Sequence, residues 1–262
     1  MSESTPHRAE IRGDAGSGPP LVYVPGIDGS GELLLGTRPK LESHFRLVRF
    51  CYRASGPAPE GGDTYASLAA SIIEGFDEAG IDRALVLAES FGGAVAVRLA
   101  LDFPERVAAL AIVNSFVHYE GKKSLAFTGA VLSVMPSFGY QIIRHLFAPA
   151  LMLAPRRDAQ ATRDFRRAPL FGLDDGYLRR MKMIATVDFR DELPNLSQPV
   201  QLFASTHDRI VDSIPSSEAM AAKIPDVKLT ILEKAGHVVL PLAAEPWVER
   251  MQALLARSDL AN

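Results

Sequence analysis

The 262-residue sequence predicts an α/β fold in which helices flank a mostly parallel sheet. Short apolar runs, typical of buried strands, alternate with longer segments of helical periodicity, and this alternation favours parallel strands. Reactive side chains follow directly after three of the runs, where the carboxyl ends of parallel strands would meet. We expect strands at residues 21–25, 46–51, 84–88, 107–113, 199–204 and 227–232. We expect helices at about 31–43, 64–79, 91–102, 213–223 and 241–256.

The composition favours one domain, or one domain with an insertion, because 47% of the residues are hydrophobic and can fill a sizeable core. A net charge of −3 gives no electrostatic case for nucleic-acid binding. The single cysteine, Cys51, excludes an internal disulfide framework. No CxxC motif or histidine cluster indicates a metal, and we expect no cofactor. Residues 1–20 are polar without an apolar signal core, which predicts a flexible tail, with at most Arg8–Arg12 as an edge strand, on a cytoplasmic protein.

Ser90 stands between a predicted strand and a predicted helix, in the sequence Ala88-Glu89-Ser90-Phe91-Gly92-Gly93. The small residues at positions −2, +2 and +3 permit a sharp turn that would expose the serine hydroxyl at the top of the sheet. The N-terminus of the following helix would then direct its free N–H groups at whatever the hydroxyl attacks. A serine that only caps the helix is the alternative interpretation.

An acid and a histidine follow two later strands, in an order that suits catalysis by Ser90. Asp208 comes after the run at 199–204, and His237 comes after the run at 227–232. His237 would take the serine proton as a general base, and Asp208 would hold the imidazole in the required tautomer. The rival candidates are His207 for the base and Asp188, Asp191 and Asp212 for the acid. His207 precedes the acid instead of following the last strand, so it suits the role of the base less well than His237. The acid could also follow the strand at 107–113, but that strand ends at Asn114, which carries no carboxyl.

The motif Ala88-x-Ser90-x-Gly92, followed by Asp208 and then His237, resembles the α/β-hydrolase superfamily. The resemblance extends from Leu21 to about Ala256, with alanine in place of the usual first glycine of the serine motif. It implies acyl transfer through a covalent acyl-serine intermediate.

A tetrahedral intermediate of acyl transfer needs N–H donors for its negatively charged oxygen, and two backbone positions are suited to supply them. Phe91 follows the nucleophile. Ile27 lies after the first strand, in a glycine-rich loop where many members of the superfamily have His-Gly and this chain has Pro25-Gly26. A phosphate-binding loop is the alternative for this stretch, but no lysine follows it. We therefore predict an oxyanion hole formed by the N–H groups of Ile27 and Phe91.

Residues 116–197 break the alternation and predict a helical cap, inserted after the sixth core strand position of the superfamily, with the core domain at 21–115 and 198–262. The first half of this segment is strongly apolar, which indicates a substrate with a hydrocarbon acyl or aryl part, or else packing of the cap on the sheet. Prolines and charged residues interrupt it, so we expect no membrane span. The predicted substrate contacts are Gly26, Asp28, Glu89, Phe138, Phe147 and Val238.

The second half of the predicted cap is basic, with eight lysines and arginines against four acids between Arg156 and Lys182. A solvated helical face is the ordinary explanation of such a pattern. The more specific hypothesis is a docking patch for an anionic carrier of the substrate, such as CoA or an acyl carrier protein.

The sequence thus predicts a serine hydrolase that cleaves a carboxylic ester or thioester with an apolar acyl or aryl part. An acyltransferase that uses the same acyl-enzyme and a carbon–carbon bond hydrolase remain alternatives. A binding protein on the same fold is a third possibility, and it would need no intact triad.

Overall fold

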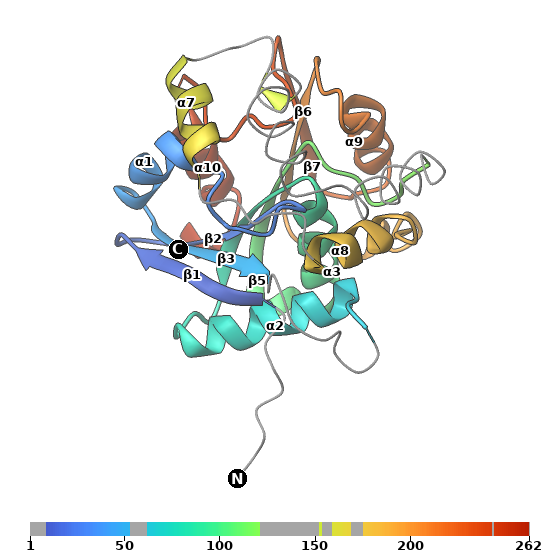
Figure 1. The fold of residues 1–262 in the computed structure, drawn as a ribbon. Helices are drawn as coiled ribbons and strands as arrows, with labels where there is room; N and C mark the ends of the chain where they lie inside the picture. The colour runs from blue at the N-terminus through green and yellow to red at the C-terminus, as the bar shows by residue number, and fades with distance from the viewer. Residues whose placement is uncertain are drawn as a thin grey trace.

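The structure is a computed structural model, and it describes residues 9–52, 62–120, 152–153, 159–168, 175–242 and 244–261. Seven strands form one sheet in the order β1-β3-β2-β4-β5-β6-β7 (Figure 1). The strands are β1 (Ala9–Ala15), β2 (Pro20–Val24), β3 (Arg46–Tyr52), β4 (Ala84–Glu89), β5 (Val107–Val113), β6 (Val200–Ser205) and β7 (Val227–Leu232). Strands β2 to β7 pair in parallel, and only β1 runs antiparallel to its neighbour. The predicted α/β class with a mostly parallel sheet is confirmed.

The described helices follow the predicted alternation with the strands. They are α1 (Arg38–Glu42), α2 (Tyr65–Glu78), α3 (Phe91–Asp102), α7 (Ala159–Arg167), α8 (Asp175–Ile184), α9 (Ser213–Ala221) and α10 (Trp247–Leu255), with short 3-10 turns at Leu35–Thr37, Pro104–Arg106, Leu193–Asn195 and Asp259–Ala261. Two helices begin later than predicted. Helix α1 starts at Arg38 after glycines with positive φ, and α10 starts after Pro246, whose fixed φ suits a helix entry.

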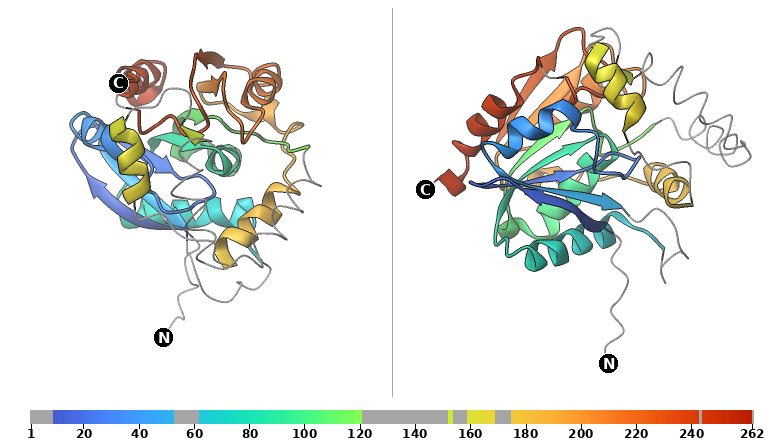
Figure 2. Two further views of the ribbon diagram at one scale, coloured as in Figure 1. Left: turned by 45° about the horizontal axis from the view of Figure 1, so that its top comes forward. Right: turned by 60° about the vertical axis from the view of Figure 1, so that its left-hand side comes forward.

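Strand alternation divides the apolar residues between two cores, one on each face of the sheet. On β2, Val22 and Val24 pack in the core with α2 and α3, whereas Leu21 and Tyr23 pack in the core with α1 and α10. Successive side chains of a strand point to opposite faces of the sheet, so a strand buried on both faces is apolar at every position. Figure 2 shows the two helical layers on either side of the twisted sheet.

Residues 9–15 form the edge strand β1, which extends beyond Arg8–Arg12, the longest strand predicted within the N-terminal tail. This strand pairs with β3 along its length, from Ala9 opposite Tyr52 to Ala15 opposite Leu47. Ala9 is the only residue of the strand that is buried, and the others are exposed or half-buried. The sequence of this strand is therefore mostly polar and does not stand out as an apolar run. An edge strand of this kind gains its order from pairing rather than from its own apolar content.

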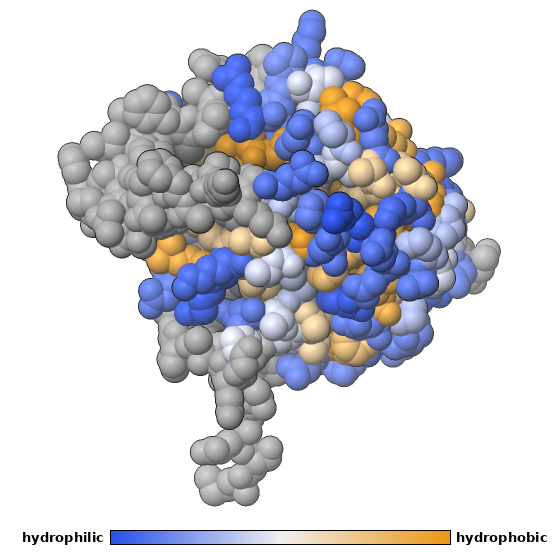
Figure 3. Space-filling view, turned by 90° about the vertical axis from the view of Figure 1, so that its right-hand side faces the viewer, coloured by the Kyte–Doolittle hydropathy of each residue, from blue (hydrophilic) through white to orange (hydrophobic). Residues whose placement is uncertain are grey.

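Helices α7 and α8 lie between β5 and β6 along the chain, inside the segment predicted as a cap. Most of the apolar first half of that segment lies outside the described residues, including Phe138 and Phe147. Among the described residues, no helix has both the length and the apolar character needed to cross a membrane. On the face shown in Figure 3, hydrophobic and hydrophilic residues are interspersed.

Candidate active site

Ser90 occupies a strained turn between β4 and α3. Its φ of 52° and ψ of −126° lie outside the regions that residues with a Cβ ordinarily adopt, and its N–H donates to Val113 O at 2.9 Å. The glycines that follow are required by contact: a Cβ on Gly92 would collide with the carbonyl oxygen of Pro25, and one on Gly93 would collide with the hydroxyl of Ser115. The strain and the close packing together lift Ser90 to the carboxyl edge of the sheet.

His237 joins Ser90 to Asp208 in a continuous line of hydrogen bonds. Its Nε2 lies 3.0 Å from Ser90 Oγ, and its Nδ1 lies 2.8 Å from Asp208 Oδ2. Asp208 Oδ1 accepts the backbone N–H groups of Ile210 and Val211 at 2.9 and 3.0 Å. The carboxylate is therefore held by its own loop, and it can in turn hold the imidazole with Nε2 facing the serine hydroxyl.

The rival candidates lie away from this line. His207 is exposed and contacts its neighbour Thr206, while Asp212 is exposed at the start of α9. Asp188 pairs with Arg190, and Asp191 pairs with Lys223. Of the predicted candidates, the structure thus brings together Ser90, Asp208 and His237.

Asn114 is a site residue whose role sequence reasoning missed, because it was considered only as a possible acid. It follows β5 with a φ of 46° and is 1% exposed. Its amide nitrogen donates to the carbonyl oxygens of Gly236 and His237, at 3.1 and 2.7 Å, and its amide oxygen accepts the N–H of Ser205 at 2.9 Å. One side chain therefore ties the histidine loop to the ends of β5 and β6.

The predicted oxyanion loop reaches the nucleophile. A Cβ placed on Gly26 would lie 3.5 Å from Ser90 Cβ, so the loop after β2 passes directly beside the serine. The N–H of Phe91 belongs to the first turn of α3, whose amides have no acceptor within the helix. Phe91 itself is buried against the rings of Tyr52 and Tyr65. The loop that contains Ile27 therefore lies beside Ser90, and Phe91 follows Ser90 directly in the chain.

Comparison with known proteins agrees with this geometry. The sequence model of the α/β-hydrolase-fold family matches residues 19–244. The chain belongs to the α/β-hydrolase family.

Relatives within the family carry the names of several hydrolytic activities. A protein of Shigella flexneri serotype 5b (strain 8401), named as a carbamate hydrolase, RutD, is 28% identical over 233 residues, which are 84% of each chain. The enol-lactonase of Burkholderia xenovorans LB400 superposes with a TM-score of 0.80 at 20% identity, covering 95% of this chain and 96% of that one. A thermophilic esterase of Thermogutta terrifontis superposes with a TM-score of 0.77 at 21% identity, covering 95% and 93%. The two structural likenesses show the shared fold.

Glu89, a predicted substrate contact in this α/β hydrolase, is buried next to Ser90 in the chain. It is 4% exposed, and it accepts a short hydrogen bond from the hydroxyl of Tyr23. Burial raises the pKa of Glu89 to about 7, although the bond from Tyr23 opposes the shift. The residue before the nucleophile is therefore a carboxyl that takes up a proton near neutral pH.

Asp28 also turns inward, into the loop that carries Ile27. Its Oδ2 accepts the N–H of Ser30 at 3.0 Å and the Ser30 hydroxyl. Burial raises the pKa of Asp28, and the hydrogen bonds from Ser30 and the charge of Arg180 oppose this effect. These contacts give Asp28 a role in the fold of the loop, and its contact with a substrate stays a prediction.

Val238, another predicted substrate contact, is 2% exposed and packs in a small cluster with Leu33, Leu153 and Phe165. Its N–H donates to Met152 O at 3.0 Å. The residue after His237 therefore joins the core to the inserted segment, and its contact with a substrate stays a prediction. Among the predicted substrate contacts that the structure describes, Gly26 and Glu89 both lie next to Ser90.

Among the described residues of the inserted segment, two arginines of the basic pattern bind other parts of the chain. Arg180 is 3% exposed, and its Nε donates to Ile27 O at 2.9 Å. Arg179 pairs with Asp63 at 2.7 Å. Exposed cations remain on α7, at Arg163, Arg166 and Arg167. Within the described residues, the docking-patch hypothesis therefore rests on these arginines of α7 and on the exposed Lys182 of α8.

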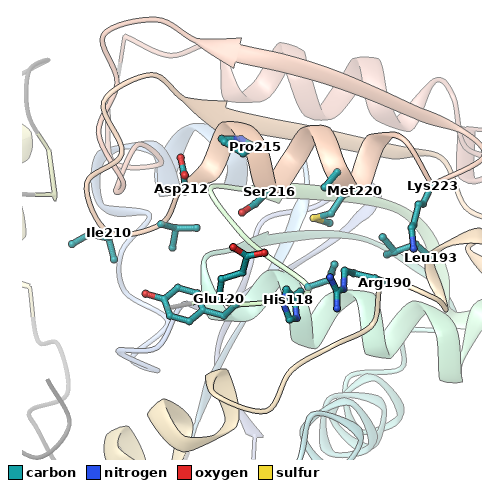
Figure 4. Close-up of a pocket in the computed structure, with 14 residues that line it drawn as sticks. His118, Glu120, Arg190, Leu193, Ile210, Asp212, Pro215, Ser216, Met220 and Lys223 are labelled. Atoms are coloured by element: carbon teal, nitrogen blue, oxygen red, sulfur yellow. The ribbon is translucent and has the colours of Figure 1, made fainter. Parts of the chain in front are cut away.

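A cavity of about 640 Å³ lies next to the Asp208 loop, between residues 117–120 and α9 (Figure 4). His118, Glu120 and Arg190 line it opposite Asp212, and the exposed Ile210 stands at its rim. None of the candidate triad residues lines this cavity. Within the part of the chain that the structure describes, no three His, Cys, Asp or Glu side chains gather as a metal site would require.

Proposed function

We propose that this α/β hydrolase is a serine hydrolase that cleaves carboxylic esters or thioesters of hydrophobic acyl or aryl substrates. The observation that carries the proposal is the line from Asp208 through His237 to Ser90, with heavy-atom distances of 2.8 and 3.0 Å. Distances of this length permit proton transfer from the serine hydroxyl to the imidazole during attack.

In the proposed reaction, Ser90 Oγ attacks the carbonyl carbon while His237 Nε2 takes the hydroxyl proton. The N–H groups of Ile27 and Phe91 stabilise the negative oxygen of the tetrahedral intermediate. His237 then returns the proton to the departing alkoxide or thiolate, which leaves an acyl-serine. Water attacks this ester while His237 takes one of its protons; the bond from the acyl carbon to Ser90 Oγ then breaks, His237 gives the proton to Ser90 Oγ, and the carboxylic acid departs. Asp208 stabilises the imidazolium at both stages.

Carbamates form a second candidate substrate class, because curated relatives named as carbamate hydrolases align over 84% of this chain. Their carbonyl group would react with the same nucleophile. Acyl transfer to an alcohol in place of water, and hydrolysis of a carbon–carbon bond, would also proceed from the same triad. Neither has an observation that favours it over ester hydrolysis, and binding without catalysis leaves the aligned triad without a use.

The test compares wild type, Ser90→Ala and His237→Gln. His207→Gln is the matched control, because His207 is exposed and is not part of the proposed triad. Substrates are p-nitrophenyl esters from acetyl to palmitoyl, the matching acyl-CoA thioesters and a p-nitrophenyl carbamate. We expect turnover in wild type and His207→Gln, and its loss in the other two variants. A wild-type protein that neither turns over any substrate nor reacts with a fluorophosphonate at Ser90 would contradict the proposal.

An anionic carrier such as CoA would meet the cations on α7. The double variant Arg166→Glu and Arg167→Glu would then raise KM for acyl-CoA thioesters and leave KM for neutral esters unchanged. Equal effects on both substrate types would contradict the carrier hypothesis and leave the esterase proposal intact.

A further inference from the structure

The loop that carries the proposed oxyanion donor Ile27 is held through its carbonyl groups. Four of them accept hydrogen bonds from the loop itself or from β3. Tyr52 donates twice, from its hydroxyl to Pro25 O at 3.0 Å and from its backbone N–H to Gly29 O at 2.8 Å. Gly26 O accepts from Gly29 N at 3.1 Å, and Gly31 O accepts from Arg49 Nη1 at 2.8 Å. The carbonyl of Ile27 is different, because its partner is the guanidinium of Arg180, at 2.9 Å from Nε. Arg180 is 153 residues away in the chain, on α8 of the inserted segment.

The surroundings of Arg180 fix the guanidinium in place. The residue is 3% exposed, and its guanidinium carbon lies 5.4 Å from the centre of the Tyr52 ring. A Cβ on Gly29 would lie 3.0 Å from Arg180 Nη2, so the guanidinium fills the space that a side chain there would need. The neighbouring Arg179 anchors the same helix elsewhere, through an ion pair with Asp63.

We propose that Arg180 is a positioning residue that aims the Ile27 N–H at the oxyanion. The N–H of Ile27 belongs to the peptide unit whose carbonyl, that of Gly26, is held by Gly29. The next peptide unit carries the Ile27 carbonyl, and Arg180 holds it. Two fixed peptide planes leave residue 27 little rotation in φ and ψ, so its N–H keeps one direction before the substrate arrives. Donors oriented in advance need no reorganisation as charge develops, which is their catalytic value.

In this proposal the inserted segment supports the oxyanion hole through Arg180, which holds the loop that carries the donor Ile27. This role rests on the proposed acyl transfer at Ser90. Charge and shape both matter in it, since a planar guanidinium can bind a carbonyl oxygen while lying on an aromatic ring, and an ammonium group is less suited to that pair of contacts.

The first test measures kcat and KM for a neutral p-nitrophenyl ester in Arg180→Gln and Arg180→Lys, with Arg179→Gln as the matched control. Arg179 is on the same helix, and its substitution removes an ion pair with Asp63, which lies outside the loop. We expect kcat to fall about 10- to 100-fold in Arg180→Gln with KM within about 3-fold, because the lost orientation matters in the transition state. Arg180→Lys should lie between wild type and Arg180→Gln, and Arg179→Gln should keep kcat within about 2-fold.

The second test does not depend on activity. Hydrogen–deuterium exchange, read by mass spectrometry on a peptide that covers residues 26–31, should be faster in Arg180→Gln and unchanged in Arg179→Gln. Unchanged exchange in Arg180→Gln would overturn the proposal whatever the kinetics show. Equal losses of kcat and of Tm in the two glutamine variants would overturn it as well, because the effect would then be one of helix stability. A wild-type protein without turnover contradicts the proposed function, whereas the exchange result still decides whether Arg180 holds the loop.

Discussion

The amide nitrogen of Asn114 donates to the carbonyl oxygen of His237 at 2.7 Å, across 123 residues of sequence. The same amide nitrogen lies 2.9 Å from Ser205 Oγ, so the contact joins the ends of β5 and β6 to the loop of the proposed base. His237 is thereby held from two sides, at its ring by Asp208 and at its backbone by Asn114. The position of the imidazole depends on strands that do not carry it.

Asn114→Asp is expected to lower both stability and turnover. The substitution replaces the amide NH2, with its two N–H donors, by one carboxylate oxygen that faces the carbonyls of Gly236 and His237. We expect a loss of about 2–4 kcal/mol in the free energy of unfolding, from unsatisfied buried acceptors and a buried charge. Urea unfolding and kcat for a neutral ester measure the two effects.

The exposed Asn195 supplies the control for this substitution, because Asn195→Asp introduces the same chemistry on the surface. The loss in Asn114→Asp should also shrink as the pH falls, since a protonated carboxyl regains one donor. Equal stability of the two variants at neutral pH would contradict the role assigned to Asn114.

Asp208→Asn tests the choice of acid against its neighbour in the same loop. The amide cannot stabilise the imidazolium and favours the wrong tautomer, so we expect kcat to fall roughly 10³- to 10⁴-fold. Asp212→Asn should stay within about 2-fold of wild type, because Asp212 is exposed and not bound to His237. A loss that followed Asp212 instead would move the acid to that residue.

Glu89 predicts a dependence of stability on pH. Its pKa is about 7 in the folded protein and has an ordinary value of 4.5, so between these values the folded state holds a proton that the unfolded state has released. The contribution is therefore fully present below about pH 4.5 and is lost as the pH rises through about 7, with a size of about 3 kcal/mol at about 1.4 kcal/mol per pKa unit.

Glu89→Gln mimics the protonated carboxyl and removes this dependence. The variant should match wild type in unfolding free energy near pH 5 and exceed it near pH 8, as measured by urea unfolding across the range. Glu105→Gln, on the exposed turn after α3, serves as the control and should follow wild type. If Glu89→Gln were less stable than wild type at pH 8, the carboxyl would be ionised and useful to the fold, contrary to this argument.

Gly92→Ala is expected to destabilise the turn at the nucleophile. The added Cβ would collide with backbone oxygens of Val24 and Pro25, which flexible side chains cannot relieve, and overpacking of this kind costs about 1–3 kcal/mol. Gly36→Ala is the matched control, because the nearest atom to its new Cβ would be 4.0 Å away and its φ is not positive. Thermal unfolding of the two variants compares them, and equal Tm values would show that the strand and helix can separate at this point.

Sequence reasoning located the strands, the turn at Ser90 and the loops of Asp208 and His237, because each of these is written in a short stretch of chain. A buried strand is apolar throughout, and a sharp turn needs small residues within three positions of its centre. Sequence reasoning underestimated the strand at residues 9–15, because an edge strand with many polar residues carries little local signal.

The sequence by itself therefore determined the fold class and the order of the reactive side chains along one edge of the sheet. Only the tertiary structure decided that Asn114 and Arg180 hold the backbone of that edge, and that Glu89 is a buried partner of Tyr23. These properties arise from contacts between residues 66 to 153 positions apart and from the removal of charges from water. The local periodicity of a sequence contains neither the long-range contacts nor the degree of burial, so these properties appear only once the chain has folded.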